Sequence, residues 1–145
     1  MHDLEIAKER LCHEDLGLSI VKQGHVVYES ASRGLLGFLE AIDEKRTILK
    51  GASIADRVVG KAVALLCVYV GVEAVYAITL SREAKKALDD HSVHNEFNSL
   101  VDAILDVSQV DMCPFEKLVA GISSPRAAYE KIRVFCKRSQ RGDQR

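Results

Sequence analysis

The run of residues 62–80 constrains the fold most, because its nineteen residues include only two clearly polar side chains, Glu73 and Thr79. That length is close to what a bilayer requires of a spanning helix. A membrane span would place Glu73 near the bilayer centre, at a cost of about 2–3 kcal/mol. Gly71 also interrupts the run before a stretch rich in β-branched residues. We therefore predict a buried helix that ends at Gly71 and a buried strand over residues 73–79 of a globular core.

The other periodicities predict an α/β domain. Ser53 is expected to cap the central helix, with Asp56 as its capping-box partner, and Ser81 to cap the helix after the buried strand. Two β-branched runs around Gly24 predict a hairpin. Helices are predicted over 3–14, 34–44, 53–70, 82–90, 114–122 and 125–136, strands over 18–29, 73–79 and 93–97, and residues 98–112 are ambiguous between helix and loop. Such strand–helix–strand crossovers imply a mixed sheet with helices on both faces.

Length and charge indicate one domain without a strong electrostatic preference for a partner. The 145 residues have 48% hydrophobic and 28% charged side chains, which excludes a disordered protein. We place the domain at residues 1–136 and expect residues 137–145 to form a disordered basic tail. The formal net charge is −1, so we expect neither a membrane nor a specific nucleic acid as partner. Residues 113–145 nevertheless carry a net +5, so a phosphate-seeking tail is the alternative to a frayed end.

Cysteine usage and the first residues predict a cytoplasmic location. The four cysteines include no Cys-x-x-Cys pair, and a chain of this size does not need a disulfide scaffold. The N-terminus lacks the basic start and apolar run of a signal peptide.

Asp56, Gly60 and Lys61 form the first candidate site. In a helix over 53–70, the four-residue spacings of Asp56 with Gly60 and of Arg57 with Lys61 would gather a carboxylate and two cations near the helix start. Free amides at a helix start attract anions, so this pattern predicts a small anionic or phosphate ligand. The structural alternative is a capping box beside a lysine whose stem is buried and whose ammonium group reaches water. We expect Lys61 at the rim of a pocket.

The sequence Cys-Pro-Phe-Glu-Lys at residues 113–117 forms the second candidate site. Proline is favoured at the first position of a helix, which would make Cys113 the capping residue. The field of a helix start favours the thiolate form, so Cys113 is a candidate nucleophile or redox centre. Glu116 and Lys117 are candidate ligand-binding residues, and we expect the sulfur to face the same cleft as Lys61. The structural alternative is a small apolar residue that closes a helix end.

The other cysteines, Cys12, Cys67 and Cys136, are expected on apolar helix faces. They should then react more slowly than Cys113, with Cys67 slowest because its helix is apolar all round.

A metal site is not expected. His91 and His94, with Asp89 and Asp90, have a spacing that indicates a metal corner only weakly, since a catalytic zinc needs three protein ligands. We favour a structural or solvated role for these residues and expect no metal and no cofactor.

Three motifs resemble those of a bacterial domain family of unknown function that is placed in the cytidine deaminase-like superfamily. They are Gly-Lys-Ala-x-Ala-Leu-Leu at residues 60–66, Val-Tyr-Ala-x-Thr-x-Ser at 75–81 and Cys-Pro-x-Glu-Lys-Leu-Val at 113–119. The resemblance covers about residues 2–136. It implies a three-layer α/β/α sandwich with a mixed sheet, and no known reaction.

The zinc ligands of that superfamily are missing from the corresponding positions. Its catalysts carry His or Cys followed by Ala-Glu at one helix start, and Pro-Cys-x-x-Cys at the next. The resemblance places these motifs at residues 56–62 and 80–84, and neither segment contains Cys or His. Residues 97–112 are also more acidic than the family pattern. The resemblance therefore implies a deaminase-like cleft without zinc.

Three functional hypotheses follow. The first is a domain that binds a small anionic or nucleotide-like ligand through Asp56, Lys61 and helix-start amides. The second is an enzyme that uses Cys113 as nucleophile or redox centre beside Lys61 and Asp56. The third is a non-catalytic scaffold that pairs with a partner, or with itself as a homodimer, through a sheet edge.

Overall fold

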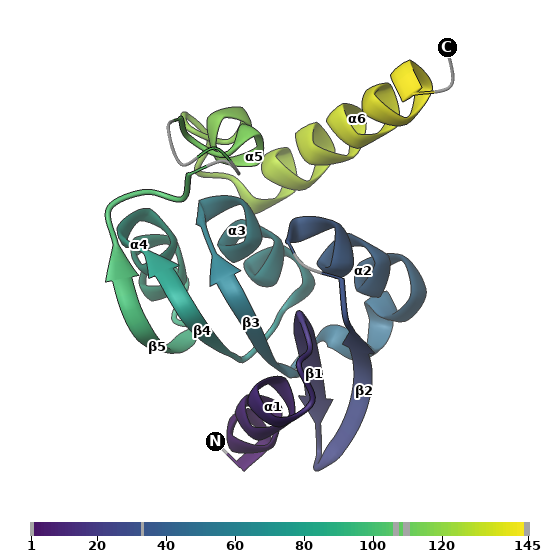
Figure 1. The fold of residues 1–145 in the computed structure, drawn as a ribbon, viewed down its shortest axis with the longest axis vertical. Helices are drawn as coiled ribbons and strands as arrows, with labels where there is room; N and C mark the ends of the chain where they lie inside the picture. Colours follow the sequence, from purple (N-terminus) through teal and green to yellow (C-terminus); the bar gives the residue numbers. More distant parts are fainter. Residues whose placement is uncertain (1, 33, 106–107, 109–110, 144–145) are drawn as a thin grey trace.

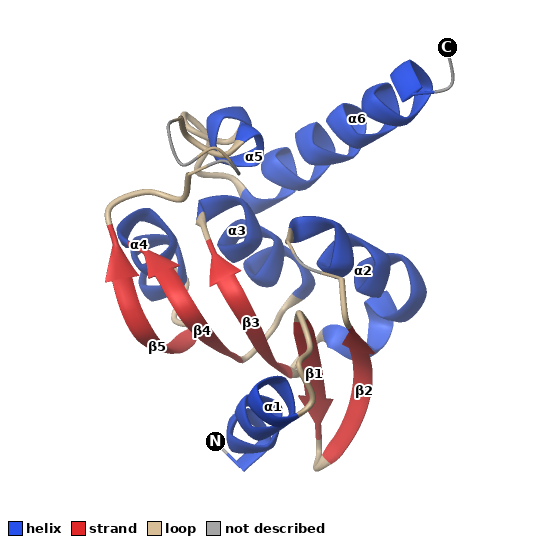
Figure 2. Cartoon of the chain, viewed as in Figure 1, coloured by secondary structure: helices blue, strands red, loops and turns tan. Residues whose placement is uncertain are grey.

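One mixed five-stranded β-sheet organises the protein in a computed structural model, which describes residues 2–32, 34–105, 108 and 111–143 (Figures 1 and 2). The helices are α1 (His2–His13), α2 (Leu35–Leu49), α3 (Lys61–Val70), α4 (Arg82–Asp90), α5 (Pro114–Leu118) and α6 (Pro125–Asp143). The strands are β1 (Leu18–Lys22), β2 (His25–Ser30), β3 (Ser53–Val59), β4 (Ala74–Ser81) and β5 (His94–Val101).

The strand order is β2-β1-β3-β4-β5. Strand β1 is antiparallel to both β2 and β3, whereas β3, β4 and β5 are parallel. The β1–β2 hairpin turns at Gln23 and Gly24, which both have positive φ, as a two-residue hairpin turn of the primed type requires. The prediction of an α/β fold with a mixed sheet is confirmed.

Helices cover both faces of the sheet. The larger core lies between the sheet and α2, α3 and α4, and includes Phe38, Ile54 and Leu66. A smaller cluster joins α1 to the opposite face through Ala7, Leu11 and the strand residues Val21 and Ala55, among others. Figure 1 shows α5 beyond the arrowheads of β3, β4 and β5, so α5 lies at the carboxyl edge of the parallel strands.

The predicted helix over residues 53–70 is wrong in its first third. Residues 53–59 form β3, and the helix begins only at Lys61. Ser53 is therefore no helix cap and Asp56 is no capping-box partner. The physical reason is pairing: β3 bonds to β1 on one side and β4 on the other, and its residues alternate between the two clusters, with Ile54 in the larger and Ala55 in the smaller.

Several predicted ends are confirmed. Gly71 ends α3 with φ 82°, while its amide and that of Val72 donate to the carbonyls of Val68 and Cys67. The Ser81 hydroxyl accepts a 3.0 Å hydrogen bond from Ala84 N and caps α4, which spans the predicted residues 82–90.

Other predicted ends are too short. Helix α2 continues past 44 to Leu49 through a non-helical Lys45, and thereby buries Leu49 completely. Strand β5 extends to Val101. Helix α6 continues past Cys136 to Asp143, so residues 137–143 are helical where we predicted a disordered tail. This segment contains Lys, Arg and Gln, which are good helix formers. Residues 106, 107, 109 and 110 of the ambiguous segment, and 144–145 of the tail, lie outside the described residues.

Among the described residues, no helix is both long enough and apolar enough to cross a membrane. The apolar run of residues 62–80 is divided between α3 and β4, and both elements contribute to the larger core.

Candidate functional site at the start of helix α3

The start of α3 is capped by a carboxylate from a distant segment. The amides of Lys61 and Ala62 donate to Oε1 and Oε2 of Glu116, each at 2.8 Å. Glu116 belongs to the short helix α5 and is only 8% exposed. One carboxylate thus accepts two charge-assisted hydrogen bonds from the first free amides of α3. It also places a negative charge at the positive end of the helix.

Gly60 makes this contact possible. Its backbone is extended, with φ −98° and ψ −176°, so conformational freedom does not explain the glycine. A Cβ atom on residue 60 would lie 2.3 Å from Glu116 Oε1 and 2.5 Å from its Cδ. Glycine is therefore required by the close approach of the carboxylate.

Burial dominates the electrostatics of Glu116. Burial raises the pKa of its carboxyl above the ordinary value, and the negative charge of Glu83 acts in the same direction. The two amide hydrogen bonds and the positive charge of Lys61 oppose this shift without cancelling it.

A cavity of about 240 Å³ lies between the starts of α2 and α3, outside the end of β3. We call it the α2–α3 cavity. Its walls are mostly apolar, with the thiol of Cys113 and the carboxylate of Glu116 as polar groups. The lining residues are Gly34, Leu35, Leu36, Val58, Gly60, Ala62, Val63, Ile104, Cys113, Phe115 and Glu116.

A smaller cavity of about 180 Å³ lies on the other side of Glu116, next to the start of α4. We call it the α4-side cavity, and it is lined by Ser81, Glu83, Asp102, Ala103, Ile104, Met112 and Glu116. Glu116 and Ile104 line both cavities.

Lys61 lies at the rim of a different depression, as predicted. It is partly exposed and lines a groove of about 250 Å³ between α3 and α4, which we call the α3–α4 groove. Glu83, Lys86, Asp90 and His91 also line this groove. Lys61 Nζ donates to the carbonyl of Ala120 at 3.3 Å.

Asp56 is buried in the central strand and is 3% exposed. Its Oδ1 accepts a 2.7 Å hydrogen bond from Arg57 N. Burial raises the pKa of Asp56 to about 7, although backbone hydrogen bonds and the charge of Arg57 oppose the shift. Asp56 lines none of the cavities described above.

Cys113, Lys61 and Asp56 therefore do not face a common cleft, contrary to our expectation. Cys113 caps α5 before Pro114, as predicted, but its side chain makes no capping hydrogen bond. It lines the α2–α3 cavity, whereas Lys61 lines the α3–α4 groove. Lys117 forms an ion pair with Asp111 instead of reaching either place.

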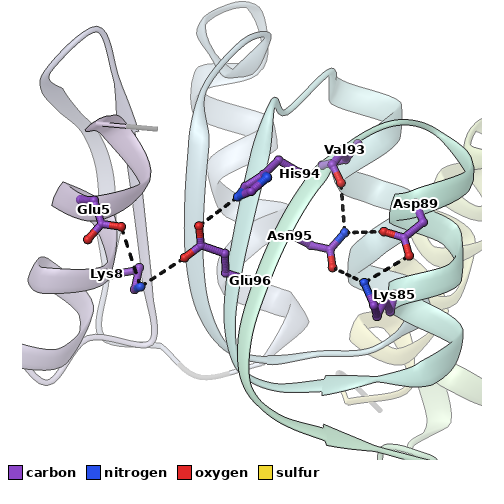
Figure 3. A network of polar contacts seen from close by, with 8 residues as sticks. All are labelled: Glu5, Lys8, Lys85, Asp89, Val93, His94, Asn95 and Glu96. Carbon is purple, nitrogen blue, oxygen red and sulfur yellow. Dashed lines mark hydrogen bonds and ion pairs between the residues drawn. The ribbon is translucent and has the colours of Figure 1, made fainter.

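His91 lines the α3–α4 groove, whereas His94 lines none of the cavities described above. Figure 3 shows His94 turned toward Glu96, which also binds Lys8 of α1, while Asp89 binds Asn95 and Lys85. Nδ1 of His91 lies 2.9 Å from the carbonyl of Ala87. Among the described residues, no group of three or more His, Cys, Asp or Glu side chains could hold a metal ion.

The two helix starts at which the resemblance led us to expect zinc motifs hold no Cys or His in residues 56–62 and 80–84. The starts of α3 and α4 carry Gly60-Lys61 and Ser81-Arg82. Glu116 accepts from the first two amides of α3, and the Ser81 hydroxyl accepts from Ala84 N in the first turn of α4.

Sequence reasoning missed the apolar walls of the α2–α3 cavity. These come from Leu35, Leu36, Val58 and Ile104, which are far apart in the sequence. Leu36 and Val58 are 54% and 42% exposed, and such exposure cannot be read from local periodicity.

Comparison with protein families identifies the chain. The model of a domain of unknown function, DUF1893, matches residues 6–136. The chain belongs to the DUF1893 family. All the candidate residues lie within the matched range, so the site is part of the DUF1893 domain.

A solved structure supports the DUF1893 fold. The crystal structure of a DUF1893 family protein from Thermotoga maritima has a TM-score of 0.82 and 26% sequence identity, and the similarity covers 94% of this chain and 90% of that one. Among curated proteins, none matches the sequence.

Cysteine accessibility corrects one expectation and yields a prediction. Cys12 is exposed on α1, because Leu4, Ala7 and Leu11 form the buried face of that helix. Cys67 is fully buried, and burial together with the nearby Asp56 raises its pKa. We therefore expect timed alkylation of the folded protein at pH 7.5 to label the exposed Cys12 first, the partly exposed Cys113 more slowly and Cys67 last.

Peptide mass spectrometry would measure the order in which the cysteines are labelled. If Cys113 reacts faster than the exposed Cys12, its thiol is activated. Labelling of Cys67 at the rate of Cys12 would contradict the buried position of α3.

Proposed function

We propose that this DUF1893 protein binds a small, ring-bearing metabolite in the α2–α3 cavity. The observation that carries the proposal is the cavity itself, with its apolar walls, two polar groups and position outside the carboxyl end of β3. Small-molecule sites in α/β proteins favour this edge of the sheet, and apolar walls with few polar groups are typical of them. A volume of about 240 Å³ suits a single ring system better than a larger cofactor.

The charge of the site selects among ligands. The Glu116 carboxylate lines the cavity and already occupies the first amides of α3, so a negatively charged group there would meet repulsion. A neutral nucleobase or nucleoside therefore suits the cavity better than a free phosphate. This proposal keeps the nucleotide-like ligand of the sequence analysis and moves any anionic group away from Glu116.

An anionic ligand has a second candidate place in the α3–α4 groove. Lys61 and Lys86 both line this groove, with His91 beside them. Glu83 and Asp90 line it too, and Lys86 pairs with Asp90 at 2.9 Å, which weakens its attraction for an anion.

A matched ligand series tests the proposal. The thermal midpoint Tm would be measured with nucleobases, their nucleosides, the nucleoside monophosphates and inorganic phosphate. A nucleobase or nucleoside at 100 times its Kd should raise Tm by roughly 5–10 °C. Cys113→Phe should abolish the shift by filling the cavity, whereas Cys113→Ser should keep it.

Shifts caused only by phosphate-bearing compounds, and lost in Lys61→Ala, would favour the α3–α4 groove instead. If no compound of the series shifts Tm, the proposed ligand class is wrong.

The enzyme hypothesis has weaker support. A nucleophile needs a base within hydrogen-bond reach, and Lys61 and Asp56 lie outside the cavity that Cys113 lines. Binding is therefore the function that the geometry supports best.

We also propose that the fold is cytidine deaminase-like. Helices α3 and α4 follow the neighbouring parallel strands β3 and β4, so both start at the same sheet edge. That arrangement agrees with the helix starts at which the superfamily carries its zinc motifs. A cytoplasmic location, and a homodimer through an outer strand, β2 or β5, belong to the same proposal.

A further inference from the structure

Helix α5 is held on the body of the protein by Glu116 and by Phe115 and Leu118, which pack against the larger core. It has five residues, which is too short for a stable isolated helix. Its polar attachment to α3 consists of the two hydrogen bonds of Glu116, assisted by the bond from Lys61 Nζ to the nearby Ala120 carbonyl. On its other side, Phe115 packs edge-on against Phe135 of α6, with ring centroids 5.5 Å apart. Glu116 is therefore the polar attachment of α5 to α3, while the amide of Cys113 donates to the Ile104 carbonyl at 2.9 Å, just after β5.

The same side chain limits the space for a ligand. Cys113, Phe115 and Glu116 come from α5 and its cap, and all three line the α2–α3 cavity. Glu116 also lines the α4-side cavity. Movement of this carboxylate away from Gly60 would widen the α2–α3 cavity toward the α4-side cavity.

We propose that Glu116 is a latch, whose two hydrogen bonds hold α5 over the α2–α3 cavity and whose release admits the ligand. This inference rests on the proposed function for its biological meaning, but the latch itself can be tested without a ligand. Loss of one of the two Glu116 hydrogen bonds weakens the attachment of α5 to α3, while the larger core between α3 and the sheet stays packed.

The four cysteines supply the probes for the test. Cys113 lies in the cap of α5 and reports release of that helix. Cys12 is exposed on the distant α1 and serves as the reference for reagent and pH. Cys67 is fully buried in α3 and reports global unfolding. The labelling ratio of Cys113 to Cys12 therefore measures local opening, and the ratio of Cys67 to Cys12 measures loss of the whole fold.

Glu116→Gln is the informative substitution. It keeps the size of the side chain, but one amide oxygen cannot accept both hydrogen bonds, and the new NH₂ group faces a backbone donor. We expect the Cys113 to Cys12 ratio to rise about tenfold, the change that corresponds to one lost charge-assisted hydrogen bond. Amide hydrogen exchange at Lys61 and Ala62 should accelerate by a similar factor, while Cys67 remains far slower to label than Cys113, because only global unfolding exposes it.

A second variant changes the residue on which the Glu116 carboxylate docks. Gly60→Ala keeps the Glu116 side chain unchanged but puts a Cβ where its carboxylate docks, so it should raise the Cys113 ratio as well. Gly121→Ala is the matched control, because a Cβ there meets nothing within 4 Å. An unchanged Cys113 ratio in Glu116→Gln overturns the latch, and so does a Cys67 labelling rate equal to that of Cys113, because both cysteines would then be exposed only by unfolding of the whole chain. If the Cys113 ratio rises and no ligand shifts Tm, the latch stands and the proposed function fails.

Discussion

Gly60→Ala should destabilise the protein by about 2–4 kcal/mol, measured as the free energy of unfolding in urea. The new Cβ would overlap Glu116 Oε1 at 2.3 Å, so the carboxylate must move and the amides of Lys61 and Ala62 lose their acceptors. The expected loss combines the strain of an added methyl group with two buried, unsatisfied donors. Gly121→Ala, whose Cβ meets no neighbour, should change the free energy of unfolding far less.

A double variant separates the clash from ordinary loss of stability. Glu116→Ala removes the cap but also frees the space beside residue 60, so adding Gly60→Ala to it should cost little. The double variant should therefore be more stable than the sum of the single effects by about 1–3 kcal/mol. Additive effects, or a Gly60→Ala variant as stable as Gly121→Ala, would show that Glu116 does not dock on Gly60.

The largest pH effect should come from Asp56. Its pKa is raised from the ordinary 3.8 to about 7 in the folded protein, mainly by burial. Below pH 4 both the folded and the unfolded state hold the proton. Between pH 4 and pH 7 the unfolded state releases it while the folded state keeps it, so stability falls as the pH rises. Above pH 7 Asp56 is ionised in both states, and the total loss of unfolding free energy is on the order of 4 kcal/mol.

Asp56→Asn isolates this contribution. The amide stays neutral and its oxygen can still accept from Arg57 N, so the variant should lack the decline of the wild-type protein. The quantity to measure is the difference in unfolding free energy between the variant and the wild type at each pH, because the other groups then cancel. Asp102→Asn removes a charge from a side chain that is 91% exposed and controls for net charge. A difference that stays constant from pH 4 to pH 8 would contradict the assignment to Asp56.

The sequence predicted many residues of the candidate site, but not how they are arranged in space. Gly60, Lys61, Cys113 and Glu116 were singled out from two separate motifs. The structure brings Gly60 and Glu116 into contact and places Lys61 and Cys113 in different depressions. The reason is that Glu116 lies 54 residues beyond Ala62, and periodicity carries no information about which distant carboxylate meets a helix start.

Local signals were sufficient where the determining contacts are local. The amphipathic face of α1, the Gln23-Gly24 turn and the Ser81 cap of α4 all depend on residues a few positions apart, so the sequence alone predicted them. The end of α3 at Gly71 is another example, because a left-handed residue is favourable there only for glycine.

Tertiary structure decided the rest. Residues 53–59 contain a Ser and an Asp at capping-box spacing, yet they form the central strand. Two neighbouring strands satisfy the backbone of β3, and both of its faces are covered, so pairing outweighs a local helix signal. The sequence by itself determined the helices and turns whose stabilising contacts lie within a few residues. Only the tertiary structure decided the position of β3, the burial of Asp56 and the docking of Glu116 on Gly60, because those depend on groups that chain folding brings together.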